Sequence, residues 1–323
     1  MSFGARAARR LAAALIGMVA LGAASMAGAQ QRTVAITQFA AHAALDAVRI
    51  GVIEGLTAAG WRDGQRLRLL ISNADGDPAR AADIARDLRN AEVDVVVPIA
   101  TPSAQAVAEN AAGLATVYAA VGDPAGAGLV PGAGRRITGV SDPTLTRETF
   151  ELIQELFPDA RWIGLLRSTG EANSEAIAGA MTWWAPGYDF RIHDVVVPAP
   201  EALAATARDV VENVEVLYLP RDNGIAARLD TVLAAAAANQ IPVVAGSAEM
   251  VRAGALAGLG ADYYALGRNV AAIVVRVLGG DDPNDIAPRV NPATDLTINT
   301  RVAAALEFRF PQSILDRAKT VHR

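Results

Sequence analysis

The chain alternates between two kinds of segment, and this alternation limits its fold more than any other feature of the sequence. Short runs rich in β-branched residues, at 33–36, 67–71, 93–99 and 115–119, are separated by segments with apolar residues at helical spacing. The run at 93–99 is apolar throughout, as expected of a strand that is buried on both faces. A β-α-β-α order of this kind predicts an α/β fold, with a mostly parallel sheet covered by helices on both faces.

The same rhythm returns in the second half of the chain. It predicts strands at 137–140, 162–166, 190–195, 214–219 and 242–245, and helices at 148–156, 174–184, 201–211, 226–238 and 266–278. A length of 323 residues is enough for two domains with separate cores. We therefore expect two similar lobes that meet near residue 141, with a ligand bound between them at the carboxyl ends of the strands.

The composition excludes several classes of protein. The chain has no cysteine, which rules out a disulfide scaffold, a cysteine nucleophile and a thiolate metal site. With 29 basic and 34 acidic residues and a net charge of −5, it lacks the basic excess that nucleic-acid binding requires. Its three histidines are far apart in the sequence. We therefore expect no metal and no cofactor.

Residues 1–29 have the features of a cleaved signal peptide. Three arginines precede an apolar run at 11–24, and Ala27-Gly28-Ala29 forms an A-x-A cleavage site. The run is too short to span a bilayer comfortably, which disfavours the alternative of an uncleaved anchor. The sequence thus predicts export to the periplasm and a mature chain that is more acidic than the precursor.

The third predicted strand is followed by Thr101-Pro102-Ser103. Thr101 is a suitable helix N-cap and Pro102 a suitable first helical residue, so the free N–H groups of the first turn would point into the space between the lobes. Such a helix start binds carboxylates readily, with help from the hydroxyl groups of Thr101 and Ser103. Simple capping explains the same residues, and the sequence leaves both interpretations open.

Other candidate ligand contacts follow other predicted strands. Gln38 and Phe39 follow the first strand and Asp123 the fourth, and the loops of the second half contribute a further set of polar residues, namely Asn173, Asp222, Asn223 and Ser247. Asp222 and Asn223 also suit the start of a helix, so capping and ligand contact are both possible there. An acidic group in one lobe that faces an anion-binding helix start in the other would suit a zwitterion such as an amino acid.

The chain has few aromatic residues, and those near strand ends are candidates for the apolar walls of a binding site, namely Phe39, Tyr218, Tyr263 and Tyr264. No HExxH, GxSxG, Walker or GxGxxG motif occurs, and no nucleophile lies at a recognisable spacing from a base. We therefore do not expect an enzyme.

Several long segments, in the same order along the chain, resemble a known family. They are VAITQFAAHAALDAVRIGVIEGLTAAGW, VVVPIATPSAQAVAENA, VYAAVGDPAGAGLV, ITGVSD, LYLPRDNGI and VVAGSAEMVRAGALAGLGADYYALGRNVA. Together they are similar to the periplasmic substrate-binding proteins of ABC importers, in the group that includes binders of tryptophan and other aromatic amino acids. The resemblance covers about residues 33–300.

The resemblance implies a type I periplasmic-binding-protein fold with two Rossmann-like lobes and a three-crossing hinge. The first lobe would comprise 31–141 and 262–288, and the second 142–261 and 289–323. It also implies ligand contacts at Thr101, Ser103, Asp123, Asp222 and Asn223, which match the family's loops.

The chain departs from the family pattern in two of its loops. Ser247 stands where many relatives carry an acidic residue, and Glu249 follows two positions later. Arg167 lies in a loop where relatives often have Tyr-Asn-Pro-Gly, and a cation there would favour a more anionic ligand than tryptophan.

The leading hypothesis is that the chain is a monomer that captures a small solute, an amino acid or related carboxylate, and delivers it to an ABC permease in the inner membrane. The alternative is an exported sensing subunit that signals to a membrane receptor. Both use the same fold and the same lobe surfaces, so the sequence does not separate them.

Overall fold

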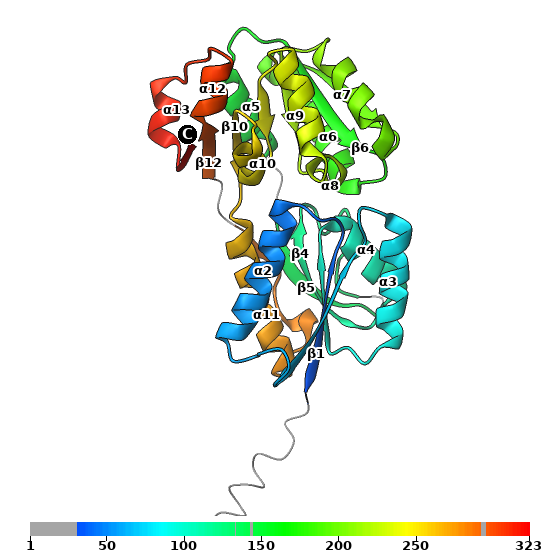
Figure 1. Ribbon diagram of the computed structural model, residues 1–323. Coiled ribbons are helices and arrows are strands. Elements are labelled where there is room, and N and C mark those ends of the chain that lie inside the picture. Colours follow the sequence, from blue (N-terminus) through cyan, green and yellow to red (C-terminus); the bar gives the residue numbers. More distant parts are fainter. Residues whose placement is uncertain (1–30, 133, 143–144, 292–294) are drawn as a thin grey trace, which may run out of the picture.

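Strands and helices alternate along the chain as predicted, and the strands form two separate sheets, one in each lobe (Figure 1). The fold is described from a computed structural model and covers residues 31–323 except 133, 143–144 and 292–294. The predicted signal peptide lies outside the described residues. Within them, no helix is both long and apolar enough to cross a membrane.

The first sheet has the strand order β11-β5-β4-β3-β1-β2, and all its pairs are parallel. Helices cover both faces, with α2 and α11 on one and α3 and α4 on the other (Figure 1). The elements are β1 (Arg32–Gln38), α2 (Ala43–Ala58), β2 (Leu67–Asn73), α3 (Pro78–Asn90), β3 (Val95–Ile99), α4 (Thr101–Asn110), β4 (Ala115–Val121), β5 (Arg136–Ser141), α11 (Tyr263–Leu278), η3 (Pro283–Asp285) and β11 (Arg289–Val290).

The second sheet has the order β13-β12-β10-β9-β8-β6-β7, with β12 antiparallel to β10 and the other pairs parallel. Its elements are α5 (Thr146–Leu156), β6 (Trp162–Ser168), α6 (Ala172–Trp184), η1 (Ala185–Tyr188), β7 (Arg191–Val197), η2 (Pro200–Ala202), α7 (Leu203–Val211), β8 (Val216–Leu219), α8 (Asn223–Ala226), α9 (Leu229–Ala238), β9 (Val243–Ala245), α10 (Ala248–Ala253), β10 (Ala257–Gly260), β12 (Asp295–Asn299), α12 (Thr300–Ala305), α13 (Gln312–Arg317) and β13 (Thr320–His322).

The structure differs from the sequence prediction in the second lobe. The helix predicted at 226–238 is α9, which begins at Leu229 and is preceded by the short helix α8, and the segment 248–260 contains a helix and a strand that were not predicted. That strand, β10, has the sequence AGLG, which lacks the β-branched residues of a typical strand. A Cβ at Gly258 would lie 2.3 Å from the carbonyl oxygen of Ala245, so the close approach of β9 requires glycine there.

The chain passes three times between the two lobes, after β5, after β10 and after β11. The first two passages lie at the positions expected near 141 and 261. At the third, β11 pairs with β5 and therefore belongs to the first sheet, although residues from 289 onward were expected in the second lobe. The type I periplasmic-binding-protein architecture is thus present, with both sheets directing the carboxyl ends of their parallel strands at the space between the lobes.

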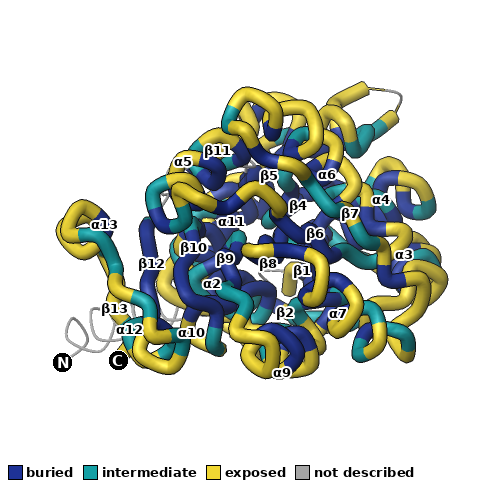
Figure 2. The backbone as a smooth tube through the Cα atoms, turned by 90° about the horizontal axis from the view of Figure 1, so that it is seen from above, coloured by how far each residue is buried: buried dark blue, intermediate teal, exposed yellow. Residues whose placement is uncertain are grey.

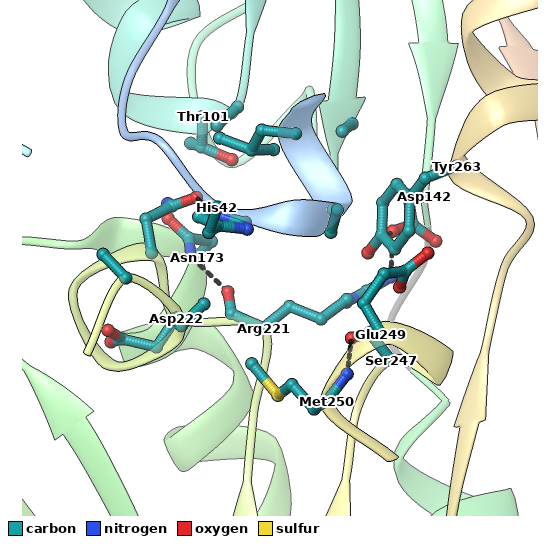
Figure 3. Close-up of a pocket in the computed structure, with 18 of the residues that line it drawn as sticks. His42, Thr101, Asp142, Asn173, Arg221, Asp222, Ser247, Glu249, Met250 and Tyr263 are labelled. Carbon is teal, nitrogen blue, oxygen red and sulfur yellow. Dashed lines mark hydrogen bonds and ion pairs between the residues drawn. The ribbon is translucent and has the colours of Figure 1, made fainter. Parts of the chain in front are cut away.

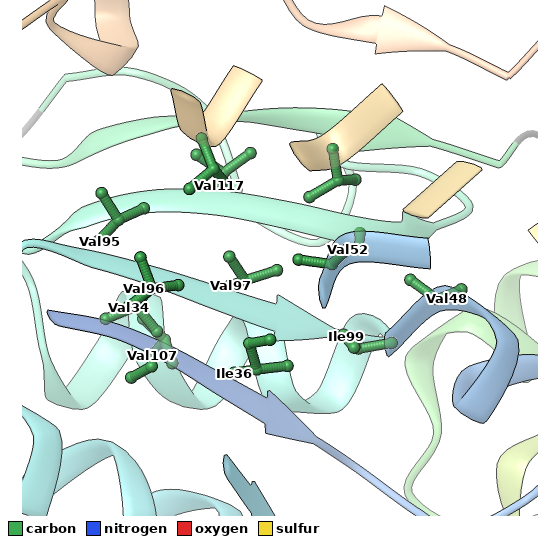
Figure 4. Packing of buried hydrophobic residues seen from close by; sticks show 14 of the residues in the cluster. Val34, Ile36, Val48, Val52, Val95, Val96, Val97, Ile99, Val107 and Val117 are labelled. Atoms are coloured by element: carbon green, nitrogen blue, oxygen red, sulfur yellow. The ribbon is translucent and has the colours of Figure 1, made fainter. Parts of the chain in front are cut away.

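Each lobe has its own hydrophobic core. In the first lobe, side chains of β1 and β3 pack against α2 and α11 on one face and against α4 on the other (Figure 4). In the second, one cluster gathers around Phe150 and Met181, and a second cluster on α7 and α9 gathers around Val210 and Val232. Seen from above, the buried backbone is concentrated in the strands and the exposed backbone at the rim (Figure 2). Burial of each large aliphatic side chain stabilises the fold by about 1.5–3 kcal/mol.

Helices α2 and α11 touch through glycines, which yields a prediction. A Cβ on Gly267 would lie 2.2 Å from the Val48 carbonyl oxygen, and one on Gly51 would lie 2.3 Å from the Tyr264 carbonyl oxygen. We expect Gly267→Ala to lower the free energy of unfolding by about 1–3 kcal/mol, because the helix backbones must separate. Urea denaturation measures this change.

Gly179 provides the matched control. It lies in α6, is exposed, and has no atom within 4 Å of an added Cβ. Gly179→Ala should raise the free energy of unfolding by about 0.4–1 kcal/mol, because alanine is the better helix former. Equal effects of the two substitutions would contradict the proposed contact between α2 and α11.

Candidate functional site

A cavity of about 340 Å³ lies between the lobes, where the carboxyl ends of strands from both sheets meet the N-termini of helices (Figure 3). Most of the predicted contacts line it, namely Thr101, Asp123, Asn173, Asp222, Asn223, Ser247 and Tyr263. The structure therefore brings together polar residues that lie up to 162 positions apart in the sequence, from Thr101 to Tyr263.

Three predicted contacts, Gln38, Phe39 and Ser103, do not line the cavity. Phe39 is 2% exposed and packs in the core of the first lobe. The Gln38 amide donates to the carbonyl oxygen of Ala40 at 2.6 Å and to Asp46. The Ser103 hydroxyl is buried without a hydrogen-bond partner. Gln38 ends β1, Phe39 follows it and Ser103 lies in the first turn of α4, so all three are near strand ends, but their side chains do not face the cavity.

The start of α4 forms one wall of the cavity. Ala100 follows β3 with φ 79° and ψ 155°, a backbone conformation that residues other than glycine rarely adopt. This turn leads directly into the helix, whose first-turn N–H groups at Thr101 and Ser103 have no carbonyl partner within the helix. Ala100 lacks a capping side chain. The helix start therefore has the free donors and the positive dipole end that bind an anion.

Asp222 has a structural role in the cavity wall. Its carboxylate is fully buried and accepts hydrogen bonds from the backbone N–H and hydroxyl groups of Ser168, at 2.7 and 2.6 Å, and from the Ser174 hydroxyl at 2.7 Å. It also accepts the N–H of Ile225 at 2.9 Å, as the N-cap of α8. Four donors satisfy this carboxylate, so the capping interpretation holds.

A second buried carboxylate, Glu171, holds Asn223 in place. It accepts hydrogen bonds from the backbone N–H and side-chain amide of Asn223 and from the N–H of Gly224 at 2.8 Å. Burial, together with the negative charge of Asp222, raises the pKa of Glu171 above its usual value. The side-chain oxygen Oδ1 of Asn223 is thereby directed at His42 Nε2, 3.2 Å away in the other lobe.

Asn173 lies beside this network at the start of α6. Its amide nitrogen donates to the Arg221 carbonyl oxygen at 2.9 Å, while its Oδ1 is buried without a donor. Helix α6 contacts α4, and both Asn173 and Thr101 line the cavity. Figure 3 shows Thr101, His42 and Asn173 on one side of the cavity.

On the other side lies a buried ion pair that sequence reasoning missed. Arg221, in the loop after β8, pairs with Asp142, which follows β5, and the Tyr263 hydroxyl donates to Asp142 Oδ2 at 2.7 Å. Burial, assisted by the charge of Asp142, raises the pKa of Tyr263 well above its usual value, so the hydroxyl remains a donor. The only signal in the sequence was the position of each residue after a predicted strand or crossing.

Glu249 also lay outside the predicted site. Ser247 caps α10, with its hydroxyl accepting the Met250 N–H at 3.2 Å, and Glu249 lies in the first turn of that helix. Glu249 lines the cavity, and its Oε2 is buried without a donor. Burial raises the pKa of this carboxyl group.

The rest of the lining is apolar and consists mainly of small side chains. Ile177, Leu229 and Met250 contribute the larger apolar surfaces, alongside a set of alanines. A cavity of this size and composition fits a small organic molecule with an apolar body.

Arg167 does not contribute to the cavity. Its guanidinium donates to both carboxylate oxygens of Asp194, with Nε and Nη2 each 2.9 Å from the nearer oxygen, and it lines a separate surface depression with Trp183. The expectation that Arg167 favours an anionic ligand in the cleft is therefore wrong. Among the residues that the structure describes, no three His, Asp or Glu side chains are grouped in a way that would hold a metal ion.

The two-lobed fold and the polar cavity between the lobes define the class of periplasmic-type binding proteins. The sequence model for "ABC transporter substrate binding protein" matches residues 33–322. The chain therefore belongs to the family of ABC transporter substrate-binding proteins.

Several relatives are similar over most of their length. A protein named tyrosine-binding protein from Clostridioides difficile is 30% identical over 283 residues, which is 87% of this chain and 82% of the relative. A crystal structure of a conserved domain protein from Vibrio cholerae is 32% identical, with a TM-score of 0.88, and the match covers 90% of this chain and 100% of that one. An ABC domain from Streptococcus pneumonia in complex with L-Trp is 31% identical, with a TM-score of 0.86 and the same coverage.

The hydrogen bonds of Asp222 predict a loss of stability when its carboxylate is replaced. Asp222→Asn puts an NH₂ group where an oxygen now accepts, and we expect the free energy of unfolding to fall by about 3 kcal/mol or more. Asp230→Asn, at an exposed cavity-lining site in the first turn of α9, should cost less than about 1 kcal/mol. Equal losses in urea denaturation would refute the structural role of Asp222.

His42 predicts a pH dependence of stability. Burial lowers its pKa from 6.5, against the opposing effects of the Asn223 hydrogen bond and the charges of Asp46 and Asp222. The unfolded state therefore binds the proton more tightly, and the His42 contribution to stability is lost as the pH falls through and below 6.5. The difference in unfolding free energy between wild type and His42→Gln should shrink between pH 7.5 and 5.5. A difference that is constant with pH would contradict the lowered pKa.

Proposed function

We propose that this chain is the extracytoplasmic solute-binding component of an ABC importer and that it binds an amino acid with an aromatic side chain. The observation that carries this proposal is the cavity between the lobes, in which an anion-binding helix start lies at one side of an apolar chamber. The names of two relatives, one tyrosine-binding and one in complex with L-Trp, support the choice of ligand class.

In this proposal the ligand carboxylate lies at the start of α4, held by the Thr101 hydroxyl and the N–H groups of the first turn. The α-ammonium group, one carbon away, donates to Asn173 Oδ1, which otherwise has no donor. The aromatic side chain lies among the apolar residues of the cavity and buries about 150–250 Å².

We further propose that the chain is exported through a cleaved leader at residues 1–29, acts as a monomer, and delivers its ligand to a permease in the membrane. The two lobes, 31–141 with 262–290 and 142–261 with the segment from 295 onward, close over the ligand through the three chain passages. Closure is favoured to the extent that the ligand contacts both lobes at once. The contact between His42 Nε2 and Asn223 Oδ1 already joins the two lobes beside the cavity.

The test is calorimetry on protein that has been stripped of ligand by unfolding and refolding, with a panel of amino acids. We expect at least one aromatic amino acid to bind and to raise the Tm of the protein. No heat and no thermal shift with any amino acid would refute the proposed ligand class.

A pair of variants tests the carboxylate site. Thr101→Ala should weaken binding about 5–150-fold, because a hydrogen bond to a charged group is lost. Ser103→Ala should change affinity little, because the Ser103 hydroxyl does not line the cavity. Thr206→Ala, on α7, serves as the control. An unchanged affinity for Thr101→Ala would show that this hydroxyl does not contact the ligand.

A further inference from the structure

The two sides of the cavity differ in the chemistry that they offer, and this difference bears on which ligands are accepted. One side has the free backbone N–H groups at the start of α4 and the acceptor oxygen Oδ1 of Asn173. The other side is formed by Asp142, Tyr263 and Glu249, with the side chain of Arg221 extending toward them from the cavity floor (Figure 3).

At this second side, the groups other than Glu249 are already paired. The charge of Arg221 is matched by Asp142, and the O–H of Tyr263 donates to Asp142. Glu249 makes no ion pair with these neighbours. Ser247 and the charge of Arg252 favour its ionised form, but its Oε2 has no donor. Rotation of the carboxyl group about its last side-chain torsion, which has no strong preference, presents either oxygen to the cavity.

An unpartnered carboxylate oxygen favours particular ligand groups. A buried acceptor without a donor is unfavourable, and a ligand that supplies an N–H or O–H group removes this cost. A second carboxylate would be repelled by Glu249, and a purely apolar group would leave the oxygen unpaired. This side of the cavity is therefore selective for a hydrogen-bond donor.

We propose that Glu249 is a specificity-determining residue that accepts a hydrogen bond from the far end of the ligand's aromatic side chain, as a phenol O–H or an indole N–H would provide. The inference rests on the proposed function. The α-carboxylate and α-ammonium groups are attached to the same carbon, so both remain near α4. Only the end of the side chain, beyond the apolar surfaces of Ile177, Leu229 and Met250, reaches Glu249.

The experiment compares pairs of ligands in which one member has this donor and the other lacks it. Isothermal titration calorimetry is carried out on stripped, refolded wild type and on Glu249→Leu, with L-tyrosine against L-phenylalanine and with L-tryptophan against 1-methyl-L-tryptophan. In wild type we expect the donor-bearing member of at least one pair to bind about tenfold or more tightly. In Glu249→Leu we expect that ratio to fall to about one, while the affinity for the ligand without the donor is kept.

Glu212→Leu, an exposed position at the end of α7, is the matched control and should keep the wild-type ratio. Retained binding of the ligand without the donor shows that Glu249→Leu is folded. An unchanged ratio in Glu249→Leu, or no preference in wild type, overturns the inference while leaving the proposed function intact. An equal loss for both members of a pair also overturns it, because Glu249 would then bind the ammonium group. If no amino acid binds wild type, the proposed function itself fails.

Discussion

Both sheets of this protein direct the carboxyl ends of their parallel strands into one space, and most features of the site follow from that constraint. A parallel strand must be followed by a crossover, so helices begin where strands end. The starts of α2, α4, α6, α8, α10 and α11 therefore surround the cavity, each with backbone N–H groups that need acceptors. The same geometry creates a site for an anion at α4 and a demand for capping groups at its neighbours.

The need for capping groups explains why polar residues after strands both cap helices and line the cavity. Asp222 and Ser247 cap α8 and α10, and Asp222 in addition fixes the loop that follows β6. Glu171 is fully used in orienting the start of α8. Asn173 and Glu249 each keep a buried side-chain oxygen without a partner, and these are two of the groups to which we assign ligand contacts.

The largely buried ion pair between Arg221 and Asp142 ties the loop after β8 to the start of the first chain passage. Removing two charges from water is unfavourable, and such a pair is maintained only when its geometry and hydrogen bonds are good. Tyr263 supplies the extra hydrogen bond, from the start of the helix that follows the second passage. The cavity wall is thus joined to two of the three segments through which the lobes would move.

The strand-and-helix alternation predicted the two α/β lobes. Seven of the ten contacts predicted from the loops after the strands line the cavity, because a parallel sheet gathers its strand ends at one edge. The side-chain directions were not predictable. Phe39 and Thr101 both follow a strand, yet one packs in the core and the other faces the cavity, since the local turn decides the direction. Asp222 and Glu249 are both acidic residues near helix starts, but four donors surround the first and none reaches Oε2 of the second.

The amino-acid sequence by itself therefore determined the class of fold, the division into two halves and the set of loops from which a site is built, because these depend on local periodicity and chain order. The tertiary structure alone decided which polar groups satisfy one another and which remain open to a ligand. It also decided that the weak segment AGLG forms a strand, since its glycines allow β10 to approach β9 and the start of α10 more closely than any side chain would permit. Pairing between residues such as Asp142, Arg221 and Tyr263 depends on distances across the cleft, which local sequence does not encode.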